Sequence, residues 1–266
     1  MPLHDLVDYF NREQRRQYGT AIVPKDTLRM RDNTVEADYA GLVLRSRFQP
    51  ILPLCQEGVY GHEALLSVHG KGGPLSPQAL FMIPTSADEI VYLDRLCRTV
   101  HALNFLLQPD PGGLLSLNIH PRHLASVRQD HGLAFEQILR QCGLAPEQVI
   151  LEIRHDPAGT EDPRGAVESY RRHGYRIALD NVTSTPSTTL WRALAPDMVK
   201  LAPELAAIER DRVLAAAARH GTPFTLQLGL TADLALQHGL SHVQARAMAP
   251  PAEGLTGPTW RRGAFP

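Results

Sequence analysis

Polar side chains recur at or near the ends of short apolar segments along most of this 266-residue chain. They are carboxylates, amides and one amine: Glu63, Glu152, Asp180, Asn118, Gln227, Gln244 and Lys200. Carboxylate and amide oxygens are ligands that hard divalent cations prefer. A cation held by them activates water and neutralises phosphate charge. These residue types therefore indicate phosphate-ester chemistry.

The elements that must position these side chains alternate between strand and helix. Apolar runs predict strands at residues 48–52, 62–68, 114–119, 149–153, 176–179, 198–201, 224–228 and 242–247. Helical periodicity lies between most of them, at residues 87–107, 135–141, 163–173, 187–194, 203–219 and 232–237. The alternation predicts an α/β fold with a largely parallel sheet. Eight strands in roughly 210 residues are typical of a (β/α)8 barrel, in which functional residues sit at the C-terminal ends of the strands.

The first two strands have an unusually short connection. Only about nine residues link them, whereas a parallel crossover needs a dozen or more. The pair is therefore predicted to be an antiparallel hairpin, which departs from the regular barrel. A doubly wound open sheet is the structural alternative, but no glycine-rich phosphate loop follows the first strand.

Composition excludes several classes of protein. The formal net charge is −1, so no global basic field favours nucleic acid or an anionic membrane. The three cysteines, Cys55, Cys97 and Cys142, are too few and too scattered for a disulfide framework or a metal knuckle. The N-terminal segment has an acid, Asp5, and no signal-like apolar run follows it. No stretch approaches the ~20 apolar residues of a membrane span. We expect a soluble cytoplasmic protein with no nucleic-acid or membrane partner.

The chain is predicted to have three parts. Residues 1–40 form an N-terminal helical and extended appendage without a core of its own. Leu3, Leu6, Val7 and Phe10 recur in it at helical spacing, and a polar stretch follows at residues 25–38. Residues 41–258 form the barrel. Residues 259–266 form a C-terminal tail.

Over residues 44–258 the sequence resembles the EAL domain, the bacterial cyclic di-GMP phosphodiesterase domain. The segments that carry the resemblance follow in order: Phe48-Gln49-Pro50-Ile51, Glu63-Ala64-Leu65-Leu66, Ser116-Leu117-Asn118-Ile119-His120-Pro121, Leu151-Glu152-Ile153, Ile177-Ala178-Leu179-Asp180-Asn181, Pro196-Asp197-Met198-Val199-Lys200 and Val243-Gln244. The resemblance implies a TIM-like (β/α)8 barrel with an antiparallel first strand. It also implies metal ligands at Glu63, Asn118, Glu152 and Asp180, and a catalytic lysine at Lys200.

Several positions depart from the family pattern. Asn181 replaces a second aspartate, which the resemblance makes a ligand of the metal pair. Gln227 replaces a glutamate that the resemblance makes a ligand and general base, and an amide takes no proton from water at working pH. Ser67 replaces the arginine of E-A-L-x-R, which loses about 1.5–3 kcal/mol of phosphate binding. The loop after Asp180 lacks both family glycines, while Gln49 and Gln244 are retained.

We therefore expect a degenerate EAL domain in which Lys200 and Gln227 are vestigial and no catalytic residue functions. Its metal residues, including Asn181, would form a vestigial Mg or Mn site that holds at most one divalent cation, so no cofactor is expected. The expected role is regulatory, in bacterial cyclic di-GMP signalling through an unidentified protein partner, with residues 1–40 and the altered loop at the interface. The remaining ligand-binding positions are Gln49, Ser67 and Gln244, and binding of cyclic di-GMP is doubtful.

Two alternatives stay open. One is an inactive sensor that still binds cyclic di-GMP or another nucleotide. The other is a weakly active metal-dependent phosphodiesterase that uses one metal ion and His155 or another group as the base. The family pairs through the region near the altered loop, so a homodimer and a monomer are both open.

Overall fold

The computed structural model describes residues 3–108, 113–126, 139, 143–158, 162–246 and 249–255. The strands are β1 (Leu28–Arg31), β2 (Thr34–Tyr39), β3 (Leu42–Pro53), β4 (Gly61–Gly70), β5 (Gly73–Leu75), β6 (Leu114–Ile119), β7 (Val149–Arg154), β8 (Arg176–Val182), β9 (Met198–Leu201), β10 (Phe224–Gln227) and β11 (His242–Val243). The helices are α1 (Leu3–Ile22), α2 (Pro77–Leu80), α3 (Ala87–Leu106), α4 (Pro121–Ser126), the 3₁₀-helix η1 (Pro146–Gln148), α6 (Arg164–Arg172), α7 (Thr188–Leu194), α8 (Ala207–His220) and α9 (Ala232–Gln237). The helix predicted at 135–141, apart from residue 139, and the tail at 259–266 lie outside the described residues.

Eight strands follow one another around a barrel. Strands β4, β6, β7, β8, β9 and β10 are parallel neighbours in that order. Strand β3 is antiparallel to β4 on one side and to β11 on the other. An isolated parallel bridge between Leu228 and Gln244 joins the segments that follow β10 and β11. The predicted α/β barrel with an antiparallel first strand is therefore confirmed, although β11 is shorter than the strand expected at 242–247.

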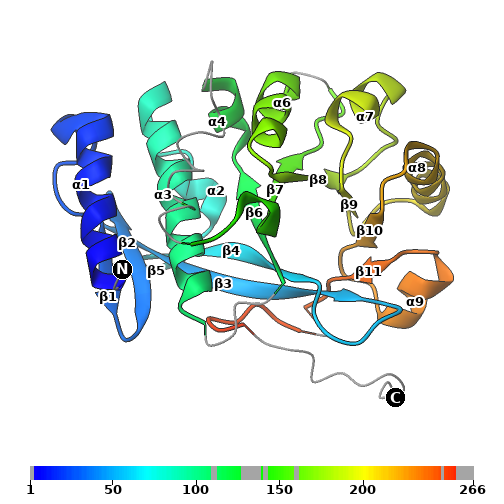
Figure 1. Cartoon of the computed structure of the whole chain (residues 1–266), viewed down its shortest axis with the longest axis horizontal. Helices are drawn as coiled ribbons and strands as arrows, with labels where there is room; N and C mark the ends of the chain where they lie inside the picture. Colours follow the sequence, from blue (N-terminus) through cyan, green and yellow to red (C-terminus); the bar gives the residue numbers. More distant parts are fainter. Residues whose placement is uncertain are drawn as a thin grey trace.

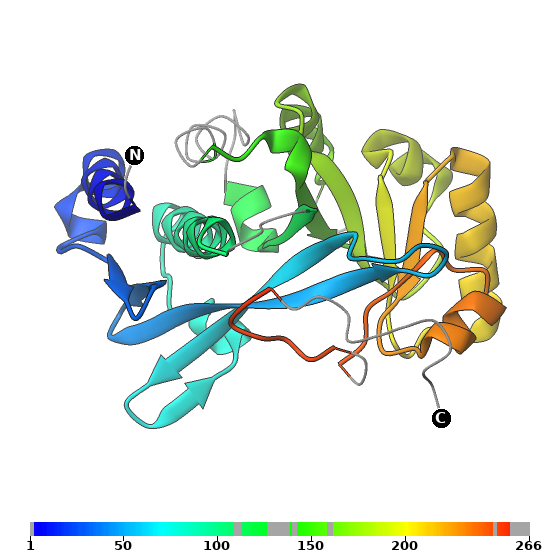
Figure 2. The same cartoon turned by 60° about the horizontal axis from the view of Figure 1, so that its bottom comes forward.

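The hairpin of β3 and β4 is much longer than the apolar runs predicted. Gln49 pairs with Glu63 in its register, and the two strands run along the length of the molecule to β5 at their projecting end (Figure 2). Strand β4 joins the parallel part of the sheet at Gly61. A Cβ atom there would lie 2.5 Å from the carbonyl oxygen of Leu114, so only glycine permits this approach of β4 to β6.

Helices cover the outer side of the parallel strands. In Figure 1, α3, α4, α6, α7 and α8 stand in a row along the sheet, with α1 beyond α3 at one end. Ser86 and Glu89 form a capping box that begins α3, and the side chain of Ser187 caps α7. The largest hydrophobic cluster lies between these helices and the sheet and includes Phe105, Trp191 and Val213. Burial of that layer holds the strands, and so the ends that carry the polar residues, in place.

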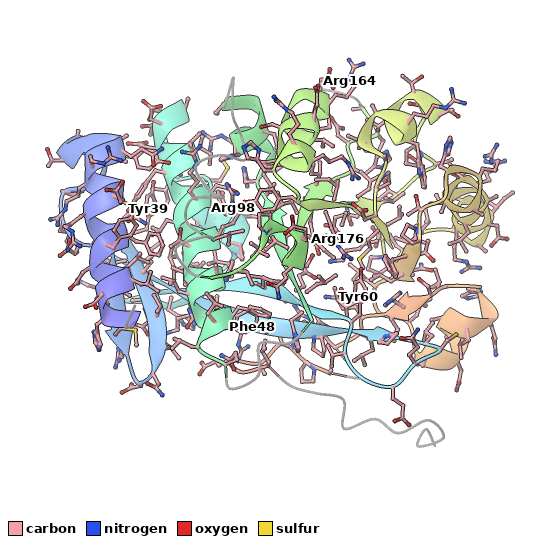
Figure 3. All side chains as sticks on the ribbon, in the orientation of Figure 1. Tyr39, Phe48, Tyr60, Arg98, Arg164 and Arg176 are labelled. Carbon is pink, nitrogen blue, oxygen red and sulfur yellow. The ribbon has the colours of Figure 1, made fainter. Side chains whose placement is uncertain are left out.

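The N-terminal segment differs from the prediction. Its polar stretch forms the hairpin of β1 and β2, which extends the sheet from β3. Leu28, Val35 and residues of α1 share a second hydrophobic cluster with α3, so this segment packs onto the barrel through a common core. Side chains along a strand alternate between its two faces, so the apolar residues of β2 lie on one face and enter this cluster from there. Figure 3 shows Tyr39 between α1 and α3, and its ring contacts that of Tyr92.

Two buried asparagines attach this segment by mimicking backbone partners. Asn104 of α3 accepts from the backbone N–H of Val35 at 2.9 Å and donates to its carbonyl at 2.7 Å. Asn11 of α1 accepts from the backbone N–H groups of Thr27 and Leu28. Among the described residues, no helix is both long and apolar enough for a membrane span.

Candidate active site

The polar site lies one layer above an apolar layer inside the barrel. That apolar layer consists of Ile51, Ile150, Ala178, Met198 and Leu226. Because side chains of a strand alternate between its two faces, the residue two positions further along points to the same interior. Strands β7, β8 and β9 place Glu152, Asp180 and Lys200 there, and the antiparallel β3 places Gln49 there. Local strand geometry thus brings the predicted residues to one mouth.

Lys200 is at the centre of this site. Its Nζ lies 2.7 Å from Oε2 of Glu63 and 2.8 Å from both carboxylate oxygens of Glu152. Oδ1 of Asp180 is 3.9 Å away. The Lys200 side chain is only 1% exposed, so these ion pairs are screened little by solvent. One ammonium group therefore joins three carboxylates from three other strands.

Amide and hydroxyl groups complete the hydrogen bonds of the two glutamates. Asn118 donates to Oε1 of Glu63 at 2.8 Å, and Gln244 donates to Oε2 of Glu63 at 2.6 Å. Ser116 donates to Oε1 of Glu152 at 2.6 Å. Gln244 also reaches Gln49 at 3.4 Å. The structure therefore brings together seven predicted residues: Gln49, Glu63, Asn118, Glu152, Asp180, Lys200 and Gln244.

The carboxylates differ in pKa because they share one ammonium. Burial raises the pKa of Glu63, but the charge and hydrogen bond of Lys200, with two amide donors, outweigh burial and lower it overall. Burial and the charge of Glu63 raise the pKa of Glu152 to about 8, against the effect of Lys200. Burial also raises the pKa of Asp180. The three carboxylates overcome burial and raise the pKa of Lys200, which stays charged.

Three predicted residues, Gln227, Ser67 and Asn181, make no side-chain hydrogen bond within this cluster. Gln227 is buried at the end of β10, and its Nε2 donates to the backbone carbonyls of Ala202 and Pro203 at 3.1 and 3.2 Å. The hydroxyl of Ser67 lies 2.9 Å from Nε2 of His69, on the part of β4 that projects toward β5. Asn181 follows Asp180 with a backbone φ of 52°, in the left-handed region.

The donor set does not fit a metal pair in this arrangement. The Lys200 ammonium takes the space between Glu63 and Glu152, and Asn118 presents its NH₂ group, not its oxygen, to Glu63. Within the described part of the chain, no three His, Cys, Asp or Glu side chains are grouped as metal ligands. Asp180 Oδ1 is a buried acceptor without a hydrogen-bond partner, so one open oxygen remains beside Lys200.

A buried ionic cluster on the wall of the mouth was missed in the sequence. Asp94 of α3 accepts from Arg98 at 2.7 and 3.0 Å and from the backbone N–H of His120 at 2.9 Å. Nδ1 of His123 lies 3.2 Å from Asp94. Figure 3 shows Arg98 on the sheet side of α3. Asp94 and Arg98 are four residues apart in the predicted helix, which was the available signal.

Two residues of this ionic cluster and two of the three carboxylates line a cavity of about 440 Å³ at the mouth of the barrel. Its wall includes Asp94, Arg98, Asn118, Glu152 and Asp180. Fold and site together define a TIM-like barrel protein with an acidic site at the C-terminal mouth. Within that class, the EAL domain family matches residues 40–224, and the chain belongs to that family.

Solved structures agree with this fold. BlrP1 of Klebsiella pneumoniae, in a complex with manganese and cyclic di-GMP, has a TM-score of 0.69 and 20% identity over 82% of this chain. The match covers 58% of the BlrP1 chain. A standalone EAL protein from Vibrio cholerae O395 in its c-di-GMP bound form has a TM-score of 0.65 and 19% identity over 80% of this chain and 94% of that one. Among curated protein sequences, none matches this chain. At these identities the structural likeness establishes the fold.

Proposed function

We propose that this EAL domain has no phosphodiesterase activity and acts as a regulatory module through contact with a protein partner. The observation that carries the proposal is the environment of Gln227. It stands where the family pattern has a general base, and its amide donates to two backbone carbonyls. An amide group takes no proton from water at neutral pH, so hydrolysis lacks its base.

The charge balance of the site also supports this proposal. Lys200 already neutralises part of the charge of Glu63, Glu152 and Asp180. A second dication would need the negative charge that Asn181 does not supply. Such a cation, where bound, would activate water and offset phosphate charge. We propose that the site needs no cofactor and that it holds at most one divalent cation, near Asp180.

An inactive nucleotide sensor is the second candidate. The cavity of about 440 Å³ at the mouth is within the size range of small-molecule sites. BlrP1 has also been solved with FMN and cyclic di-GMP and no metal ions, so in that protein the dinucleotide is present without a metal. Against this candidate, Ser67 supplies no charge for phosphate and bonds His69 instead.

The weak-enzyme alternative has less support. His155 lines a second cavity, which lies next to the mouth of the barrel, whereas Glu152 and Asp180 line the cavity at the mouth itself. Burial lowers the pKa of His155, so the ring is neutral at pH 7. A base separated in this way from the carboxylates is poorly placed to activate water bound to them.

The test is incubation of the purified full chain with cyclic di-GMP and Mg²⁺ or Mn²⁺, with products separated by chromatography. We expect no linear dinucleotide from the wild type. The double variant Asn181→Asp/Gln227→Glu restores the family residue types and is the positive comparison. Turnover by the wild type that Glu63→Ala abolishes would contradict the proposal. Calorimetry with cyclic di-GMP in the absence of metal decides between the two candidate functions, because only a sensor should bind the dinucleotide.

Partner contact is tested by affinity capture from the source cells with the full chain as bait. The matched variant is Thr185→Ala, which removes the hydroxyl bond between the altered loop and Glu209 at 3.0 Å. Light scattering of the purified chain decides between a monomer and a homodimer. The regulatory role is supported if a captured protein also binds the purified chain directly. If Thr185→Ala weakens that capture, the altered loop is part of the interface.

A further inference from the structure

A second cavity of about 480 Å³ lies beside the mouth of the barrel, outside the carboxylate cluster. It sits at the C-terminal ends of β7 and β8, between α4 and α7. Its apolar lining consists of three prolines, Pro121, Pro157 and Pro163, and of the leucine and isoleucine side chains of Leu124, Ile153, Leu179, Leu190 and Leu194. Such a volume with a mainly apolar lining is typical of a small-molecule pocket. The apolar body of a ligand would be buried against these leucine and isoleucine side chains.

The polar groups of this cavity come from the ends of β7 and β8 and from the residues that follow them. Arg154 ends β7 and is exposed, and its side chain makes no hydrogen bond or ion pair with any residue in the described ranges. Asn181 and Thr183 add neutral polar groups from the end of β8. Asp156 is the acid of the lining, and its Oδ1 accepts from the backbone N–H of Ala158 at 2.9 Å. A guanidinium that forms no ion pair with the described residues, beside an apolar surface, complements a molecule with a hydrocarbon body and an anionic end.

Arg154 and Asn181 also line the cavity at the mouth, so the two cavities share one wall. We propose that the second cavity binds a small amphipathic organic anion, with its apolar body against Leu190 and Leu194 and its anionic group on Arg154. The site lies beside the carboxylate cluster, shares Asn181 with the phosphodiesterase positions, and does not depend on the function proposed above.

Fluorescence titration with 1-anilinonaphthalene-8-sulfonate tests the proposal, because this probe joins an aromatic body to a sulfonate. The neutral N-phenyl-1-naphthylamine is the matched probe without the charge. We expect saturable binding of one sulfonate probe per chain. Arg154→Gln should weaken it about tenfold to a hundredfold and leave the neutral probe unchanged. Leu124→Trp should fill the cavity and weaken both probes.

Two control variants locate the binding. Arg192→Gln removes an exposed arginine of α7 outside the cavity, and Gln78→Trp narrows only the cavity at the mouth. Both should bind the sulfonate probe as the wild type does. Thermal melts confirm folding, and Leu190→Trp replaces Leu124→Trp if that variant does not fold. Wild-type affinity in both Arg154→Gln and the cavity-filling variant would overturn the proposal, as would loss of binding in Gln78→Trp alone.

Discussion

Lys200 and Glu63 are 137 positions apart in the sequence, yet Lys200 Nζ lies 2.7 Å from Oε2 of Glu63 inside the barrel. The ion pair joins β9 to β4 across the mouth, and Glu152 on β7 shares the same ammonium. Both partners are almost fully buried, so the pair can exist only with its hydrogen bonds complete. The chain thus supplies its own cation at a site where the family pattern places metal ligands.

Removal of that ammonium should destabilise the fold strongly. Lys200→Met leaves buried carboxylates without a counter-charge, and we expect a loss of about 3–5 kcal/mol in urea unfolding. The double variant Lys200→Met/Glu152→Gln should recover part of the loss, because it also removes one of the buried carboxyl groups that the ammonium had paired. Lys25→Met is the control, since its pair with Asp38 is 66% exposed at the lysine and should contribute less than about 1 kcal/mol. Equal losses in Lys200→Met and Lys25→Met would contradict this account.

Chelation should leave the stability of the wild type unchanged. Lys200 already neutralises part of the charge of Glu63 and Glu152, so the fold needs no divalent cation to hold these residues together. Thermal melts with EDTA, with Mg²⁺ and with Mn²⁺ are the measurement, and we expect the same Tm in all three. A cation that binds only the native state raises Tm in proportion to its saturation. If Mn²⁺ instead raises Tm by several degrees and Asp180→Asn abolishes that increase, the site binds the cation.

The buried His101 should make the fold sensitive to acid. Burial lowers the pKa of His101 to about 4 from its ordinary value of 6.5, and the hydroxyl of Ser46 lies 2.8 Å from its Nδ1. The neutral ring therefore contributes stability above pH 6.5, and that contribution is lost as the pH falls from 6.5 toward 4, by on the order of 3 kcal/mol. Urea unfolding at stepped pH measures it. His101→Gln should reduce the loss of stability in this window, whereas His4→Gln, at an exposed position, should not.

The attachment of the N-terminal segment should depend on Asn104. Asn104→Ala leaves the buried N–H and carbonyl groups of Val35 unpaired, and we expect a loss of about 1–3 kcal/mol. Hydrogen exchange should show the increased opening first in β1 and β2, because these strands form the edge of the sheet. Gln17→Ala, an exposed change on α1, is the control. Uniform loss of protection across the barrel would indicate that the segment and the barrel unfold as one unit.

Much of the barrel could be predicted because its signals are local. The short connection before Gly61 was enough to predict the antiparallel hairpin, since a parallel crossover needs more chain. Alternation of strand and helix predicted the parallel sheet. The polar stretch that became β1 and β2 was missed because a half-buried edge hairpin has few apolar residues, and its partner surface on α3 is distant in the sequence.

The sequence by itself determined which polar residues stand at the strand ends, and which family types are replaced at Ser67, Asn181 and Gln227. Only the tertiary structure decided which of them meet. Gln227 bonds to the backbone of Ala202, whereas Lys200 joins Glu63 and Glu152. The physical reason is that strand periodicity selects a face but not a partner. Which side chains bond to one another depends on how the strands pack around the barrel, and that packing is set by contacts between residues far apart in the sequence.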